Sequence, residues 1–106
     1  MASAADKYQD LVTRLEATDG VEVGQMFGKP CLEVRGKAFA AQHKETVVFK
    51  LAAADHAKAI ALSDAVLWDP SGKGRPMKEW VALTAAHARH FNAFAAAAMS
   101  YVAETV

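Results

Sequence analysis

The sequence predicts an α+β domain built as a two-layer sandwich, in which helices cover one face of an antiparallel sheet of about six strands in the order αββββαββα. Apolar residues recur at helical spacing near both ends of the chain, and four short runs with a period of two follow the first of these segments. Groups of turn residues separate the runs. Two long helices need an apolar surface to cover, and a meander that is polar on one side offers its other side.

The first helix is expected over residues 4–18. Ser3 followed by Asp6 is typical of a helix N-terminus, because the two side chains can cap each other's backbone N–H groups. Asp19-Gly20 supplies the end of the helix, since glycine adopts the left-handed conformation without a Cβ clash. The apolar residues at helical spacing are Tyr8, Leu11, Val12 and Leu15.

Four strands are expected next, as an antiparallel meander. Gly28-Lys29-Pro30 separates the first two strands, with Gly28 freeing the backbone for a turn or bulge and Pro30 blocking further pairing. Arg35-Gly36-Lys37 and His43-Lys44-Glu45 fit hairpin turns between the later strands. The apolar residues that mark the strands are Val21 and Val23, Leu32 and Val34, Phe39, and Val47-Val48-Phe49.

The second half of the chain is expected to add a short helix over residues 53–62, strands over 65–68 and 78–83, and a final helix. The segment 69–76 must be a loop, because it is dense in Gly, Pro, Asp and Ser. Thr84 can cap the final helix. The inward stripe of that helix is predicted to contain Phe91, Phe94, Ala95, Ala98, Met99 and Val102.

Aromatic side chains are expected to supply much of the core, because the chain has 24 alanines, mostly in the helices, and these pack little volume. An aromatic residue that is needed for packing is not available to stack on a ligand. The residues assigned to the core are Phe27, Phe39, Phe49, Trp68, Trp80, Phe91 and Phe94.

One domain is expected over residues 1–106, since the length is near the commonest domain size and no linker or repeat divides the chain. Hydrophobic residues make up 53% and charged residues 23%, and no apolar run approaches the roughly 20 residues of a bilayer span, so no membrane partner is predicted. The first ten residues show no secretory-signal pattern, so we expect a cytoplasmic protein.

The charges balance overall, with 12 Lys and Arg against 12 Asp and Glu, so no whole-molecule field favours nucleic acid. Residues 1–28 hold two bases and five acids, whereas residues 29–50 and 73–89 each carry a charge of plus three. The segment Gly72 to Arg75 fits either an anion-binding turn or a solvated one. The candidate anion or nucleic-acid contacts are Lys73, Arg75, Lys78, Lys29, Arg35 and Lys37.

No catalytic residue, metal ligand or cofactor is predicted. Cys31 is the only cysteine and is interpreted as a small buried hydrophobe. His87 and His90 are three residues apart, but a metal site needs a third ligand that the sequence does not place near them. We expect His43, in a turn, and His56, in a short helix, to be exposed.

Two segments together resemble the N-terminal domain of TfoX/Sxy-type proteins. These segments are Met26-Phe27-Gly28-Lys29-Pro30-Cys31-Leu32, with the following Gly36 to Ala40, and Gly74-Arg75-Pro76-Met77-Lys78-Glu79-Trp80-Val81. The resemblance covers essentially the whole chain and implies an α+β domain, similar in fold to YjbR-like proteins. For larger members it implies a regulatory role in DNA-uptake competence, but those members carry a second domain.

Three functional hypotheses follow from these observations. The first is a small non-enzymatic regulatory or adaptor domain that binds another protein through a sheet face or edge. The second is a weak nucleic-acid-binding domain, linked to transcription or competence regulation, that uses the basic residues named above together with Lys44. The third is a small-molecule enzyme with a site assembled in space. A homodimer through an edge strand is left open as well.

Overall fold

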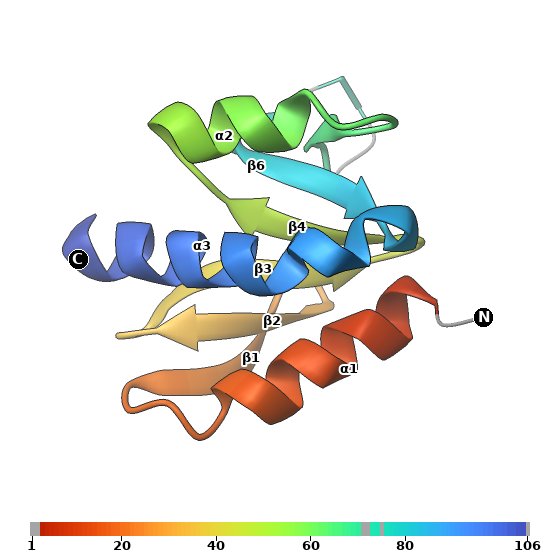
Figure 1. Ribbon diagram of the computed structural model, residues 1–106. Helices are drawn as coiled ribbons and strands as arrows, with labels where there is room; N and C mark the ends of the chain where they lie inside the picture. Colours follow the sequence, from red (N-terminus) through yellow and green to blue (C-terminus); the bar gives the residue numbers. More distant parts are fainter. Residues whose placement is uncertain (1–2, 71–72, 75, 106) are drawn as a thin grey trace.

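The computed structural model describes residues 3–70, 73–74 and 76–105 and confirms the predicted fold class. A six-stranded antiparallel sheet carries three α-helices in the order αββββαββα (Figure 1). The elements are α1 (Ala4–Leu15), β1 (Val21–Met26), β2 (Lys29–Val34), β3 (Lys37–His43), β4 (Thr46–Lys50), α2 (Ala53–Ile60), β5 (Val66–Trp68), β6 (Met77–Thr84), a 3-10 helix η1 (Ala85–His90) and α3 (Phe91–Thr105). The Cα radius of gyration of 12.4 Å is that of a compact domain.

The spatial order of the strands is β1-β2-β3-β4-β6-β5, so β6 is inserted between β4 and β5. Figure 1 shows α1 and α3 in front of the sheet, so both helices cover the same face. The strand edges of the sheet are β1 at one side and the three-residue β5 at the other.

Helix α1 begins as the sequence predicts and ends earlier than expected. Ser3 Oγ accepts a hydrogen bond from Asp6 N, and Asp6 accepts one from Ser3 N, which completes a capping box. The helix ends at Leu15 and not at residue 18. Gly20, with a φ of +86°, then leads the chain into β1.

The first four strands are joined by two-residue turns, as the pairs Met26↔Lys29, Val34↔Lys37 and His43↔Thr46 show. In the β1–β2 turn both Phe27 and Gly28 have positive φ, which is the geometry of a type I′ hairpin. The predicted block at Pro30 is wrong for the β1–β2 ladder, because Pro30 lies inside β2 opposite Gln25. The pairing with β3 begins only after Pro30, at Cys31.

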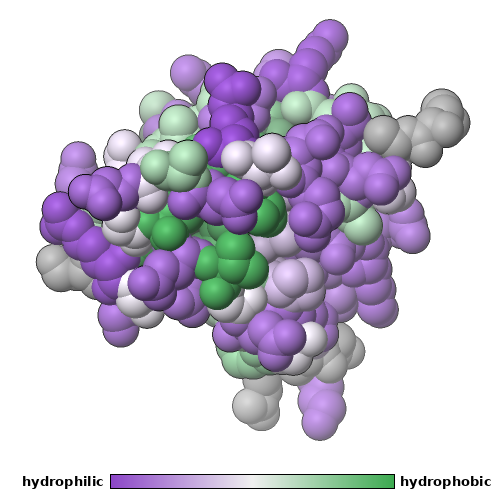
Figure 2. Space-filling view, turned by 90° about the horizontal axis from the view of Figure 1, so that it is seen from below, coloured by the Kyte–Doolittle hydropathy of each residue, from purple (hydrophilic) through white to green (hydrophobic). Residues whose placement is uncertain are grey.

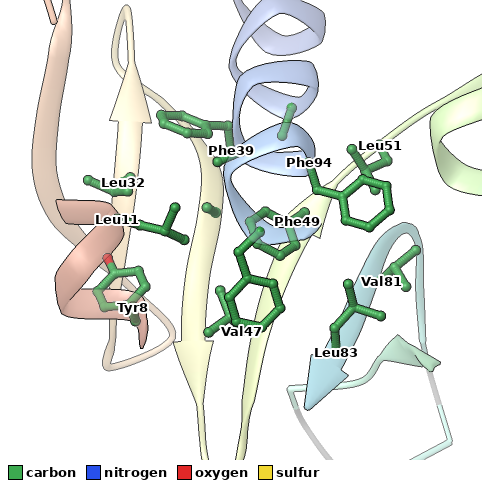
Figure 3. Packing of buried hydrophobic residues seen from close by; sticks show 14 of the residues in the cluster. Tyr8, Leu11, Leu32, Phe39, Val47, Phe49, Leu51, Val81, Leu83 and Phe94 are labelled. Carbon is green, nitrogen blue, oxygen red and sulfur yellow. The ribbon is translucent and has the colours of Figure 1, made fainter. Parts of the chain in front are cut away.

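The main core lies between the sheet and α1 and α3 (Figure 3). Phe49, at its centre, contacts Phe91 and Phe94 with ring centroids 5.4 and 6.2 Å apart. A bulge in β3 adds to this core: Leu32 pairs with Ala40 and Glu33 with Ala38, which leaves Phe39 as the extra residue. Phe39 and Ala40 are therefore both buried on the helix side.

The start of the last helix differs from the prediction. Thr84 makes no side-chain cap, and residues 85–90 form a 3-10 segment with a kink at His87. Helix α3 begins at Phe91 and presents the predicted stripe, with Met99 only partly buried.

The expectation that one side of the meander is polar is wrong. A second group of buried residues lies on the face that α1 and α3 leave uncovered, because Val48, between the core residues Val47 and Phe49, points the other way. We call this side the open face. Its buried residues are Cys31, Ala41, Val48, Trp68, Trp80 and Ala82.

Candidate functional site on the open face

Two tryptophans from the last two strands form the centre of the open face. Trp68 pairs with Met77 although its neighbour Leu67 pairs with Val81, so residues 78–80 bulge out of the β5–β6 ladder. This irregularity places the rings of Trp68 and Trp80 side by side, with centroids 5.3 Å apart. Both are almost fully buried, and among the described residues their cluster contains no residue from a helix. The small residues Ala41 and Ala82 of neighbouring strands belong to the same cluster.

Phe27, in the turn between β1 and β2, contacts this tryptophan pair from the β1 side of the sheet. Its ring meets Trp68 edge to face, with centroids 6.1 Å apart and planes at 70°. The side chain is 61% exposed, so the prediction that Phe27 belongs to the core is wrong. Its φ of +53° is an unusual conformation for a bulky residue. The turn therefore holds a large apolar ring outside the core at a cost in backbone strain.

His43, at the end of β3, binds the other side of Trp68. Trp68 Nε1 donates a hydrogen bond to His43 Nδ1 at 2.7 Å, so the neutral imidazole carries its proton on Nε2. Burial, Lys29 and Lys44 lower the pKa of His43 below its usual value. The expectation of an exposed turn residue is wrong, because His43 is half-buried and fixed by Trp68.

Stability is expected to depend on pH through His43. Because its folded pKa is lowered, the unfolded chain binds the proton more readily, and stability is lost as the pH falls below the usual histidine pKa. Urea unfolding of the wild type between about pH 5 and 8 should show this slope. His43→Gln, whose amide oxygen can still accept from Trp68, should show a shallower one. Equal slopes in the two proteins would contradict the assignment.

A cavity of about 410 Å³ lies beside Trp68 and His43, between the β3–β4 turn and β5. Val66, which is 56% exposed, and Ala82 form much of its apolar wall. This volume is within the range of small-ligand and side-chain pockets. The remaining lining residues are Lys44, Glu45, Thr46, Leu67 and Asp69.

Cys31 is buried, as the sequence predicts, and it lies on the open face. Its thiol lies 3.9 Å from Glu33 Oε2. The Glu33 carboxylate also lies close over Gly24: a Cβ atom on residue 24 would be only 2.8 Å from Oε2. Burial and the charge of Glu33 raise the pKa of Cys31 to about 11. The thiol therefore stays protonated at neutral pH and is a poor nucleophile.

The structure divides the candidate basic contacts between opposite ends of the sheet. Lys29 lies at the β1–β2 turn, whereas Arg35 and Lys37 lie at the β2–β3 turn, and Arg35 Nη1 donates to Ala103 O at 3.5 Å. Lys78 is the second residue of β6, at the end of the sheet where Arg35 and Lys37 lie. Lys73 is an exposed residue of the β5–β6 loop, and Arg75 lies outside the described residues.

The other histidines are held apart from one another. His87 Nε2 lies 2.7 Å from Ser63 O, His90 packs beside Phe94, and His56 Nε2 lies 2.8 Å from Lys78 O. Within residues 3–70, 73–74 and 76–105 no group of three or more His, Cys, Asp or Glu side chains is arranged to hold a metal ion. Gly74 N donates to Asp69 Oδ2 at 2.8 Å, so part of the β5–β6 loop is tied to its own first residue.

Comparisons of the chain with models of protein families, with curated proteins and with solved structures find no match. None of the helices in the described part of the chain is long and apolar enough to cross a membrane.

Proposed function

We propose that this domain is a non-enzymatic regulatory or adaptor domain, and that it binds a segment of another protein on the open face beside Phe27. The observation that carries the proposal is the position of Phe27, which is 61% exposed, strained in the left-handed region and in contact with a buried tryptophan. Strained residues of this kind cluster at functional sites. An asparagine at this turn position would relieve the strain but would present no apolar ring.

The surroundings of Phe27 support a protein partner. Phe27 and Val66 are two of the three large hydrophobic residues that are clearly exposed in the described chain, and both lie beside Trp68. Aromatic residues and methionine are enriched in protein interfaces, and the partly buried Met26 and Met77 complete the surface. Charges of both signs, Lys44 and Glu45 among them, lie at the rim.

The chemistry of the cavity defines the partner segment. An aliphatic or aromatic side chain fits the apolar wall formed by Val66, Leu67 and Ala82. His43 Nε2–H is a hydrogen-bond donor beside this wall, suited to a backbone carbonyl of the segment. We therefore expect the partner to present an apolar anchor residue next to an accessible carbonyl group.

Two alternatives keep some support. A nucleic-acid binder could stack a base on Phe27 beside Lys29 and Lys44, although the other candidate cations lie at distant ends of the sheet or on the β5–β6 loop. A small-molecule enzyme could use the cavity, whose lining includes His43 with its lowered pKa. Membership of the TfoX/Sxy type stays a prediction. The Met-Phe-Gly segment on which it partly depends lies at the turn of the β1–β2 hairpin and includes Phe27.

The test compares Phe27→Asn with Arg35→Asn as baits. Both variants place asparagine at the first position of a type I′ turn, where it is favoured, so both should fold at least as stably as the wild type. Only Phe27→Asn removes the proposed contact. We expect it to lose partner binding by about tenfold or more, as removal of an interface anchor does, while Arg35→Asn binds normally.

The measurement is affinity capture from native lysate, with and without nuclease, followed by titration of the partner that is identified. A protein retained by the wild type and Arg35→Asn after nuclease treatment, and lost from Phe27→Asn, supports the proposal. Equal recovery by all three baits contradicts the role of Phe27. Recovery that disappears with nuclease would favour the nucleic-acid alternative.

A further inference from the structure

The outer edge of β1 is the second surface with exposed apolar character. β1 pairs with β2 on one side, and no strand among the described residues lies on its other side. Seen from the side of β1 and α1, the surface shows a small group of hydrophobic residues surrounded by hydrophilic ones (Figure 2). Val23 of β1 is 55% exposed, and its neighbour Val21 is buried against the core.

Proteins usually protect such an edge, and in β1 the only charged side chain is that of Glu22. Lysine, proline, a bulge or a very short strand prevents edge strands from pairing with other chains. β1 has six residues, contains neither lysine nor proline, and pairs with β2 without a register shift. The opposite edge, β5, has only three residues.

The backbone of β1 presents its free groups at alternate residues. Arg35 N donates to Gly20 O at 3.2 Å, so residues 20, 22, 24 and 26 direct their N–H and C=O groups toward β2. Val23 and Gln25 therefore direct both of theirs outward, whereas Val21 offers only its C=O, because its N–H donates to Thr18 O at 3.1 Å. These three residues also share one face of the strand, since side chains alternate.

We propose that a second copy of this chain pairs with β1 in antiparallel orientation, about a two-fold axis that passes through Val23. Such an axis keeps the helices of both copies on one face of a continuous sheet. Residues of the two copies that lie opposite each other must then point to the same face of that sheet. Val23 would lie opposite Val23 of the partner subunit, and Glu22 opposite Gly24 of the partner subunit. An axis at Glu22 would instead place two carboxylates opposite each other, which is unfavourable.

The charges near β1 favour the same orientation. The acidic residues Glu16, Asp19 and Glu22 lie at or before the start of β1, whereas Lys29 lies just after its end. Lys29 Nζ is 3.4 Å from Phe27 O, so the cation stays at the turn. Antiparallel pairing brings the acidic end of each copy beside the basic turn of the other. Association should therefore weaken as the salt concentration rises.

The experiment measures the mass in solution and the register. Sedimentation equilibrium should give about twice the chain mass of 11.3 kDa for the wild type, and a monomer for Val23→Lys, which places a charge at the axis without disturbing a buried residue. Circular dichroism checks that the variant is folded. A monomeric wild type, or a dimer that Val23→Lys leaves intact, would overturn the proposal.

Cysteine variants test the register. Val23→Cys should form an intersubunit disulfide under mild oxidation, because directly opposed residues have Cα atoms about 5.5 Å apart. Gln25→Cys should not, since its copies would lie about four residues apart along the strands, beyond the reach of a disulfide. Cys31 is fully buried and serves as an unreactive background. Crosslinking of Gln25→Cys in preference to Val23→Cys contradicts this register.

Partner binding and self-pairing can be separated. Phe27→Asn should stay dimeric, because Phe27 lies outside β1, and Val23→Lys should keep the open face intact. Failure of one proposal therefore leaves the other unaffected, and each has its own readout.

Discussion

Replacing Trp68 with alanine is expected to lower the free energy of unfolding by about 3–5 kcal/mol, the usual cost of removing a buried aromatic side chain. The Trp68 side chain is 3% exposed and contacts the rings of Trp80, Phe27 and His43. Its loss would open the adjoining cavity onto the small residues of the open face. Against a typical stability of about 5–15 kcal/mol, this loss is severe.

Urea unfolding followed by circular dichroism measures the effect of Trp68→Ala without relying on tryptophan emission. Trp68→Phe is the matched control, because it keeps a ring in place and removes the hydrogen bond to His43. We expect it to cost well under half as much as the alanine variant. A loss below about 1 kcal/mol for Trp68→Ala, a value typical of surface contacts, would show that the open face does not act as a second core.

Replacing Tyr8 with phenylalanine is expected to stabilise the protein by about 1–3 kcal/mol, the cost of a buried polar group without a partner. The Tyr8 hydroxyl is enclosed between α1 and the sheet and has no hydrogen-bond partner among the described residues (Figure 3). Burial, with a smaller effect of Cys31, raises the pKa of Tyr8 far above its usual value. Removing one oxygen leaves the ring and its contacts unchanged.

Tyr101→Phe is the control for Tyr8→Phe, because the Tyr101 hydroxyl donates a hydrogen bond to the Glu79 carboxylate. It should leave stability unchanged or lower it slightly, in contrast to Tyr8→Phe. Thermal unfolding is sensitive enough, since 1 kcal/mol shifts the midpoint of a domain this size by about 4–8 °C. A lower midpoint for Tyr8→Phe would contradict the prediction and indicate that the hydroxyl is hydrogen-bonded.

Much of the fold could be predicted because its signals are local. The Ser3–Asp6 cap and the Arg35-Gly36 turn act within a few residues, so their sequence pattern and their structure coincide. The bulge at Phe39 could not be predicted, since it depends on how Leu32 of the neighbouring strand pairs. The end of α1 and the 3-10 segment before Phe91 depend likewise on packing against other elements.

The open face was missed although a signal for it was present. Val47, Val48 and Phe49 are three consecutive apolar residues, and such a run is typical of a strand that is buried on both faces. The alternation of apolar and polar residues in the earlier strands instead favoured a sheet with one polar face. The exposure of Phe27 could not be predicted, because an aromatic residue beside glycine usually belongs to the strand and not to the turn.

The insertion of β6 between β4 and β5 has a consequence for how the chain folds. The first four strands pair through turns of two residues, whereas the pairing of β4 with β6 closes the segment of residues 51–76. Non-local pairing of this kind is slower than hairpin formation. Both tryptophans of the chain lie in β5 and β6. Tryptophan fluorescence during refolding therefore reports the pairing of the last two strands. The earlier formation of the β1–β4 meander does not have a tryptophan signal of its own.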